Sequence, residues 1–224
     1  MNSSFGDPIW EQIFSSRDWG RYPPEEVIRF YNLAKTELSD VPSVLDIGCG
    51  KGACSWYMSK EGGYVTAIDG SPNGISNVDI LANEFNLETS IDLVLGDITK
   101  PKSHLSSSFN IMVDNYSLCV NPEEKIISAL EDYYELLKVQ GHFLMNSFGE
   151  KSTGYGTGTQ LSEHTWTDVK EGCMKDRGVI TWFESEYLHS LVQNFGFLIQ
   201  SYTNILENRD NMLIEKHILH LCKG

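Results

Sequence analysis

The chain has few basic residues and no long apolar run, and each of these absences excludes a class of function. Its 224 residues include 17 Lys and Arg against 31 Asp and Glu, a formal net charge of −14. Proteins that bind nucleic acids usually present a basic face to the phosphates, so we expect no nucleic-acid partner. No apolar stretch reaches membrane-spanning length, and residues 1–7 lack the basic and apolar regions of a signal peptide. We therefore expect no membrane association and a cytoplasmic location.

Cysteine is also sparse, and its spacing excludes the common metal sites. The five cysteines form no Cys-x-x-Cys pair and no cluster with histidine at zinc-ligand spacing. Reduced thiols in a cytosolic protein fit this pattern best, and we predict no metal site. No internal repeat or linker divides the chain, so residues 1–224 are predicted to form a single domain, as a monomer or homodimer.

The most informative stretch is a glycine-rich turn near residue 50. Residues 44–52 read VLDIGCGKG, an apolar run that ends in Asp46 and is followed by Gly48, Gly50 and Gly52. A helix-compatible pattern resumes at residue 53, which indicates strand, tight turn and helix. Glycines there permit positive φ and let a ligand approach the bare backbone. A dinucleotide fingerprint would carry its third glycine one place later.

Two further apolar runs end in acids at one-helix spacing. Residues 65–69 end in Asp69, and residues 91–98 contain Asp97. With the glycine turn, these runs resemble class I S-adenosylmethionine-dependent methyltransferases of the small-molecule type. The resemblance implies that S-adenosylmethionine is the cofactor and S-adenosylhomocysteine its product.

The resemblance also implies a role for each part of the pattern. Asp46, Gly48 and Gly50 would hold the methionine portion, Asp69 the ribose and Asp97 the adenine. Neighbouring residues predicted to line the same cofactor site are Cys49, Gly70, Ser71, Ile98 and Asn115.

Alternating strand and helix patterns predict a doubly wound α/β fold with a mostly parallel sheet. Residues 109–114 and 141–147 read as the fourth and fifth strands. Residues 197–202 and 212–221 read as an antiparallel pair joined by a turn at 207–211. The resemblance implies seven strands in all, with the last one antiparallel.

Two segments lie outside this pattern. Residues 1–39 are predicted to form an N-terminal helical lid, and residues 148–182 a glycine-rich, mobile insertion on the substrate side. Between the lid helices, Trp19 and Arg21 have two interpretations. They either pack against the edge of the core or fold over the cofactor, with Arg21 near its carboxylate.

Catalytic candidates follow from the chemistry of methyl transfer. The nucleophile must be aligned opposite the leaving sulfur, and a hydroxyl acceptor also needs a base to take its proton. His164, beside Glu163 in the insertion, is the leading base, although a surface histidine is an equal alternative. Tyr116 would align the nucleophile or pack beside the methionine moiety, and Asp114 would orient either residue or cap the next turn.

The absence of two motifs reduces the number of acceptor types to consider. The Asn/Asp-Pro-Pro-Tyr motif of adenine and glutamine methyltransferases is absent, and Asn146 with Ser147 does not supply the Asp-Asn pair of the magnesium-dependent catechol type. We therefore predict methylation of a small molecule, at a hydroxyl oxygen. The alternatives are an amine acceptor, a catalytically silent S-adenosylmethionine-binding domain, and an NAD-dependent reductase.

Overall fold

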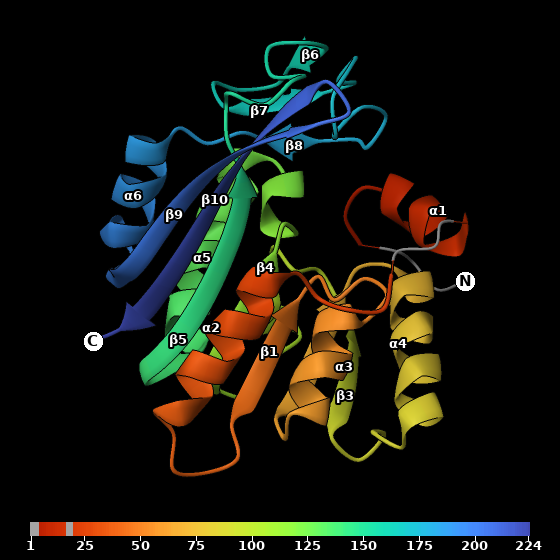
Figure 1. The fold of residues 1–224 in the computed structure, drawn as a ribbon, viewed down its shortest axis with the longest axis vertical. Helices are drawn as coiled ribbons and strands as arrows, with labels where there is room; N and C mark the ends of the chain where they lie inside the picture. Colours follow the sequence, from red (N-terminus) through yellow and green to blue (C-terminus); the bar gives the residue numbers. More distant parts are fainter. Residues whose placement is uncertain (1–4, 17–19) are drawn as a thin grey trace.

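The computed structural model describes residues 5–16 and 20–224, and this part is built on one twisted sheet (Figure 1). The strands of this sheet are, in spatial order, β3 (Ile91–Leu95), β2 (Tyr64–Asp69), β1 (Ser43–Ile47), β4 (Phe109–Asn115), β5 (Leu137–Phe148), β10 (Met212–Lys223) and β9 (Phe197–Arg209). The helices are α1 (Ile9–Ser16), α2 (Glu25–Thr36), α3 (Ala53–Lys60), α4 (Pro72–Phe85), α5 (Glu123–Leu136) and α6 (Ser185–Asn194). Strands β3, β2, β1, β4 and β5 pair in parallel, whereas β10 runs antiparallel to both neighbours. The predicted seven-stranded fold is confirmed.

Both faces of the sheet are buried at its central strands, where successive side chains point to opposite sides. In β1, Val44 joins one buried cluster, whereas Leu45 and Ile47 join the other. The first cluster packs under α2, α3 and α4, and the second under α5 and α6. This two-sided burial explains why the central strands read as continuous apolar runs.

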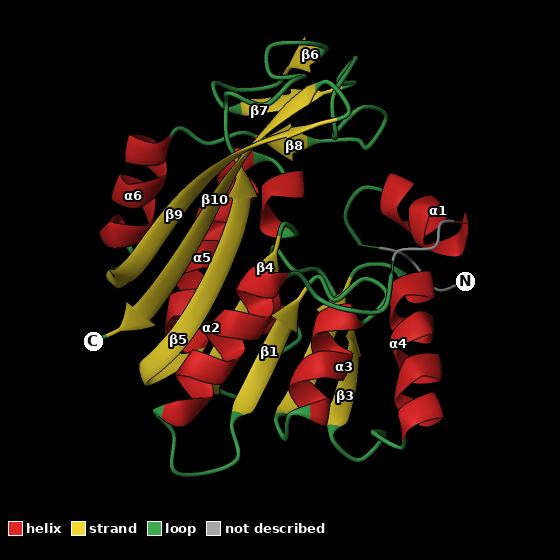
Figure 2. Cartoon of the chain, in the orientation of Figure 1, coloured by secondary structure: helices red, strands yellow, loops and turns green. Residues whose placement is uncertain are grey.

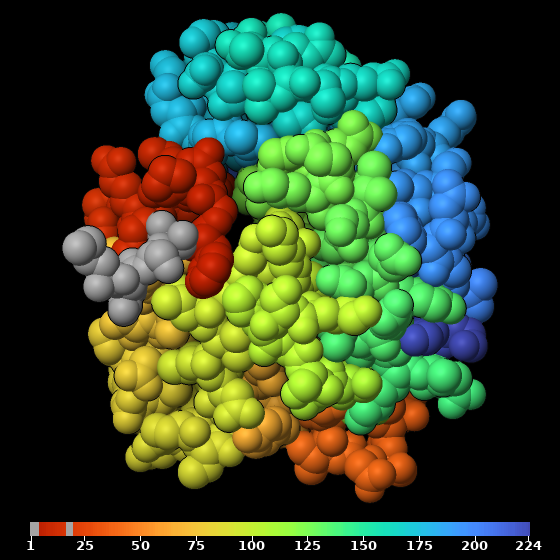
Figure 3. Space-filling model, turned by 180° about the vertical axis from the view of Figure 1, so that it is seen from behind, coloured from red at the N-terminus to blue at the C-terminus, as the bar shows by residue number. Residues whose placement is uncertain are grey.

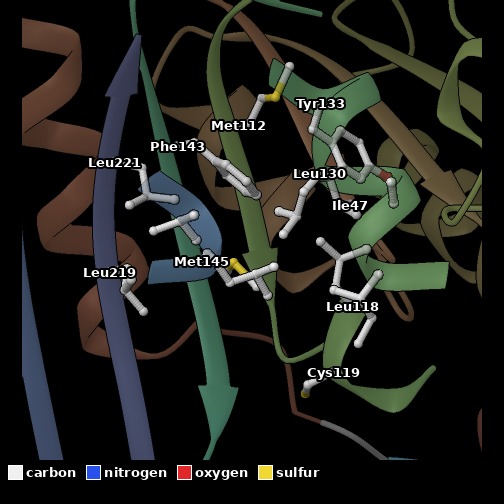
Figure 4. Packing of buried hydrophobic residues seen from close by; sticks show 14 of the residues in the cluster. Ile47, Met112, Leu118, Cys119, Leu130, Tyr133, Phe143, Met145, Leu219 and Leu221 are labelled. Atoms are coloured by element: carbon white, nitrogen blue, oxygen red, sulfur yellow. The ribbon is translucent and has the colours of Figure 1, made fainter. Parts of the chain in front are cut away.

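The cluster under α5 and α6 is the larger one (Figure 4). Leu130 and Tyr133 of α5 lie near Phe143 and Met145 of β5 in this view. Helix α5 passes directly into β5, whose Gln140 adopts a positive φ of 60°. Because no loop separates the two elements, β5 begins at Leu137, four residues before the start at residue 141 that the sequence predicted.

The terminal hairpin is antiparallel as predicted, but its strands are longer. Strand β9 continues to Arg209, and the turn is reduced to Asp210 and Asn211, with φ values of 51° and 62°. Positive φ at both central residues is typical of a tight hairpin turn. Glu207, which the sequence predicted to lie in the turn, forms an ion pair of 2.5 Å with Lys216 across the two strands.

The insertion is not a simple long loop, which corrects the expectation from its glycines. It contains a small antiparallel sheet of β6 (Thr159–Gln160), β7 (Thr165–Thr167) and β8 (Ile180–Thr181), beyond the central sheet in Figure 2. Its base is attached to β10 through Glu215. The carbonyl of Glu215 accepts the N–H of Gly149 at 2.9 Å, and its Oε2 accepts the N–H of Lys151 at 2.9 Å.

A buried histidine pair makes the fold sensitive to acid. His142 Nδ1 and His220 Nε2 lie 2.9 Å apart under α2, with Phe30 against His220 and Glu37 3.4 Å from His142. Burial lowers the pKa of His220 from 6.5 to about 4. The folded state thus takes up this proton less readily than the unfolded chain.

We therefore predict that the contribution of His220 to stability is complete above about pH 6.5 and is lost as the pH falls toward 4. Urea unfolding of the wild type and of His220→Gln at pH 8 and pH 5 measures this contribution. The gap between the two proteins should narrow at pH 5. An equal gap at both values would contradict the prediction.

Candidate active site

The glycine turn after β1 is the first element of the site. Gly48 and Gly50 have φ values of 66° and 52°, a region that side chains other than glycine rarely adopt. A Cβ on Gly48 would lie 2.3 Å from the Cβ of Ser117, so this turn and the one after β4 approach closely. The N–H groups of Gly48 and Cys49 both donate to the carbonyl of Ile68, at 2.8 and 3.1 Å. The turn is therefore held against the end of β2.

Three carboxylates stand at or just beyond the carboxyl ends of neighbouring parallel strands. Asp69 accepts the N–H of Gly50 at Oδ2 and that of Ser71 at Oδ1, each at 2.8 Å. Asp46 accepts the hydroxyl of Ser55 at 2.5 Å. Burial raises the pKa of Asp46 to about 7 and that of Asp69 to about 6. These groups are suited to pairing with a ligand that brings positive charge or hydroxyl donors.

The third acid, Asp97, lies in the turn after β3. Its Oδ1 accepts the N–H and the hydroxyl of Thr99, at 2.9 and 2.7 Å. Its own N–H donates to His104 Nε2 at 3.1 Å. The carboxylate is thus fixed in orientation beside the cavity that it lines.

These turns surround one cavity of about 260 Å³. It is lined by Asp46, Gly48, Cys49, Gly50, Asp69, Gly70, Ser71, Asp97, Ile98, Asn115 and Tyr116, all of which the sequence had singled out. The carboxyl ends of parallel strands are where ligands of open α/β sheets bind. The cavity is the candidate active site.

Helix α1 covers one side of this cavity. Glu11 accepts the hydroxyl of Ser71 and, at 3.1 and 2.6 Å, the backbone and side-chain N–H groups of Asn73, so it is attached to the start of α4. Trp10 and Phe14 of α1 line the cavity. Just before the helix, the N–H of Phe5 donates to the carbonyl of Gly70 at 2.8 Å.

The insertion covers a second side and meets α1 at Asp7. Asp7 Oδ1 accepts the N–H of Ile9 at 3.0 Å, and Oδ2 accepts that of Val179 at 3.3 Å. Met174 and Arg177 of the insertion line the cavity. In Figure 3 the red N-terminal segment lies beside the cyan insertion. One carboxylate therefore joins two segments that are about 170 residues apart in sequence.

Tyr116 has an unusual environment. Its φ is +64°, and the carboxylate of Asp114 holds the turn around it by accepting the N–H groups of Ser117 and Leu118 at 2.7 and 3.0 Å. Its ring stacks on Phe148 at 4.6 Å between centroids. Within the described residues, the buried hydroxyl has no hydrogen-bond partner, and burial raises the pKa of this phenol. The group is a protonated donor at the cavity wall.

Other predicted residues are placed elsewhere. Arg21 forms an ion pair of 3.2 Å with Glu84 and lies over the ring of Phe85, and it is not among the residues that line the cavity. This contact fits the interpretation in which the linker packs on the body. Trp19 lies outside the described residues.

His164 also lies apart from the lining residues. Its ring stacks on Tyr187 at 4.4 Å, and its Nδ1 lies 3.3 Å from Glu150. Tyr187 in turn donates to Glu123 at 2.5 Å. The imidazole is thus not among the residues that line the cavity, and its role as a base stays a prediction.

Sequence analysis did not single out several lining residues. They are Phe5, Asp7, Trp10, Glu11, Phe14, Lys51, Val120, Asn121, Phe148, Met174 and Arg177. Asp7 stands just before a helix and Arg177 is one of the few cations of the insertion, but neither feature indicates a cavity. Their approach to the cavity depends on tertiary contacts.

The described residues lack two further kinds of feature. No group of three or more His, Cys, Asp and Glu side chains there is arranged to hold a metal ion. Among the helices of this same part of the chain, none has the length and apolar character needed to cross a membrane.

Comparison with known proteins identifies the family. A family model described as a methyltransferase domain matches residues 38–208. The chain belongs to this methyltransferase family.

The curated relatives include two described as probable cobalt-precorrin-6B C(15)-methyltransferases (decarboxylating). The one from Methanobrevibacter smithii is 32% identical over 72 residues, 32% of this chain and 38% of the relative. The one from Methanococcus maripaludis is 34% identical over 73 residues, 33% of this chain and 40% of the relative. The matches therefore span about two fifths of these relatives.

Solved structures share the methyltransferase fold. An S-adenosylmethionine-dependent methyltransferase from Methanosarcina mazei has a TM-score of 0.68 at 18% identity, covering 85% of this chain and 97% of that chain. The 1,6-didemethyltoxoflavin N1-methyltransferase from Burkholderia thailandensis, solved with S-adenosylhomocysteine, has a TM-score of 0.65 at 18% identity, covering 89% and 79%. The predicted family and its cofactor, S-adenosylmethionine, are confirmed.

The contact between α1 and the insertion yields a prediction. Asp7→Ala removes the acceptor for Val179 N–H, so the insertion should open more often and trypsin should cleave after Lys175 and Arg177 faster, by about fivefold for one lost hydrogen bond. Glu171→Ala, an exposed acid of the same insertion, is the matched control. Equal cleavage rates in the two variants would show that Asp7 does not hold the insertion.

Proposed function

We propose that this methyltransferase transfers a methyl group from S-adenosylmethionine to an oxygen atom of a small molecule. The observation that carries the proposal is the cavity where the acid-ended strands meet the glycine turn, enclosed by α1 and the insertion. A pocket closed on two sides by the chain suits a small molecule better than a polymer. The net charge of −14 supports the same conclusion.

The lining residues fit the chemistry of the cofactor. S-adenosylmethionine carries a sulfonium, an amino group, a carboxylate, a ribose diol and an adenine amine. An ionised carboxylate can accept about four hydrogen bonds, and Asp69 uses two for protein N–H groups. Asp69 therefore keeps acceptor capacity for the diol, and Asp97 does so for the adenine amine.

The remaining groups of the cofactor have counterparts in the glycine turn. Asp46, Gly48 and Gly50 are assigned to the methionine portion, because the positive φ of both glycines shapes the turn that lines this part of the cavity. Lys51 lines the cavity in the same turn and supplies a positive charge for the carboxylate. Cys49, Gly70, Ser71, Ile98 and Asn115 complete the proposed cofactor site.

When bound, S-adenosylmethionine supplies an activated methyl group. The chain contributes alignment, because Tyr116 at the end of β4 faces the same cavity, and α1 and the insertion exclude water. His164 stays the predicted base for a hydroxyl acceptor, and reaching the cavity would require the insertion to move.

An amine acceptor is the runner-up, because an amine can arrive already deprotonated and needs no strong base. A silent S-adenosylmethionine-binding domain is the third possibility. The curated relatives' names specify a carbon acceptor, but their matches cover only a third of this chain and carry no argument for the acceptor here. A single domain over residues 1–224, with a lid at 1–39 and a substrate-side insertion at 148–182, is part of the proposal. Within the predicted lid, α1 covers the cavity, whereas α2 packs on the central sheet.

Asp69→Asn tests the cofactor assignment. The substitution keeps the size of the side chain but removes a charge-assisted acceptor, which should weaken S-adenosylmethionine binding by about 1.5–3 kcal/mol, or roughly 10- to 150-fold. Isothermal titration measures the change. Asp92→Asn, an exposed acid of β3, should bind like the wild type. An unchanged dissociation constant for Asp69→Asn would contradict the assignment.

The acceptor atom is read from the product. We expect a screen of small hydroxyl compounds, acids and amines with methyl-labelled S-adenosylmethionine to give an O-methyl product, identified by mass spectrometry. An N-methyl product would establish the runner-up instead. Cofactor binding without turnover on any acceptor would favour the silent domain.

A further inference from the structure

Part of the cavity wall has no place in the proposed cofactor site. It is formed by α1, the turn after β4, the end of β5 and the insertion. Its members are Trp10, Phe14, Tyr116, Val120, Phe148, Met174 and Arg177. We call this set the acceptor wall, and the inference drawn from it rests on the proposed function.

Most of the acceptor wall is aromatic or apolar. Tyr116 and Phe148 stack with their ring planes 24° apart, and the ring centroids of Trp10 and Phe14 lie 5.9 Å apart. Met174 adds a flexible, polarizable side chain from the insertion. Such a wall favours an acceptor with a flat, largely apolar body.

The polar groups of the acceptor wall are hydrogen-bond donors. The buried hydroxyl of Tyr116 has no partner among the described residues, and burial raises its pKa, so it keeps its proton. A buried donor without a partner is costly, so an acceptor atom that a ligand brings to this hydroxyl as it binds beside the ring would be favoured. Arg177 adds a guanidinium with five N–H donors, enough to share between the protein and a ligand. Both groups are complementary to a negatively charged oxygen or nitrogen.

A general base is lacking at this wall. None of the six histidines, all of which lie in the described ranges, is among the residues that line the cavity. The two carboxylates that α1 and the segment before it bring there are occupied. Asp7 accepts backbone N–H groups at both oxygens, and Glu11 is held by Ser71 and Asn73. The other carboxylates of the cavity, Asp46, Asp69 and Asp97, belong to the proposed cofactor site. An acceptor that must lose a proton therefore finds no base at the acceptor wall itself.

We propose that the acceptor is a small planar acid whose nucleophilic group is already ionised when it binds, with Arg177 and Tyr116 recognising the anion. A lone pair of the anion forms the new bond to the methyl carbon. The carbon–sulfur bond breaks, and its electron pair stays on sulfur as a neutral thioether. No proton is released, so the reaction needs no base.

The arrangement also suits the electrostatics of this step. An anion and a sulfonium react to give two neutral products, and their charges disappear together. Water stabilises the separated charges more than the products, so a cavity shielded by α1 and the insertion favours the reaction. Arg177 specifies the anion, while Tyr116, stacked on Phe148, fixes its orientation.

Binding to the product complex tests the proposal directly. The probes are 4-hydroxycoumarin and 2-naphthoate, which are planar anions at pH 7.5, with neutral coumarin and 2-naphthamide and cationic benzylamine as counterparts. Isothermal titration uses the full chain saturated with S-adenosylhomocysteine. At least one anion should bind, and more tightly than its neutral counterpart.

Substitutions test whether the acceptor wall causes the tighter binding of the anion. Arg177→Gln should weaken binding of that anion by roughly 10- to 100-fold, and Arg177→Lys by less. Tyr116→Phe should weaken it by roughly 2- to 10-fold. Lys175→Gln removes a positive charge from the same turn at an exposed position and should have no effect. All variants should keep their affinity for S-adenosylhomocysteine, which shows that they fold.

The proposal is wrong if no anion binds the product complex, if Arg177→Gln and Lys175→Gln behave alike, or if a neutral compound or the amine is methylated in preference to the anions. These outcomes concern the acceptor alone. The proposed cofactor site is tested independently, by S-adenosylhomocysteine binding and by the effect of Asp69→Asn on S-adenosylmethionine binding.

Discussion

The carboxylate of Asp69 is the interaction on which the rest of the site depends. It is 7% exposed and joins two turns, because its oxygens accept the N–H groups of Gly50 and Ser71. Gly50 belongs to the turn between β1 and α3, whereas Ser71 caps α4 by accepting the N–H of Gly74. The same Ser71 hydroxyl donates to Glu11, so α1 is attached at this point as well. One buried acid therefore sets the relative positions of the glycine turn, the start of α4 and the segment that covers the cavity.

The enclosure of the cavity uses acidic residues as acceptors for backbone groups. Glu11 attaches α1 to the start of α4, and Asp7 attaches the segment before α1 to Val179 in the insertion. At the start of the insertion, the side chain of Glu215 in β10 accepts a hydrogen bond from the N–H of Lys151. In this chain of net charge −14, part of the acidic composition thus has a structural purpose. These contacts form over long sequence separations, so the closed cavity depends on the complete fold rather than on any local motif.

Local patterns predicted the sheet well, and their limits are physical. The strand that ends at Ile47 and the glycines at positive φ follow from residue type over a few neighbours. The extension of β9 to Arg209 does not, because that part of the hairpin is solvated and its pairing depends on partners such as Lys216. Strands of two or three residues in the insertion are too short to show any periodicity. For the site, sequence identified the lining that strand ends provide, but it could not identify Met174 or Arg177, which reach the cavity through tertiary contacts.

His164 shows that neighbours in sequence do not predict the partners of a side chain in the folded chain. Its neighbour in sequence, Glu163, suggested an activated base, but the partners in space are Tyr187 and Glu150. On the proposal that the acceptor binds already ionised, this imidazole takes no part in the reaction, and the two sides of the cavity have opposite electrostatic demands. The acids around the cofactor site favour a cation, whereas the donors of the acceptor wall favour an anion. On this assignment, both attractions weaken once the methyl group has moved, since the thioether and the methylated acceptor are neutral. The arrangement that binds the two reactants then also promotes the release of both products, without a proton relay in the cavity.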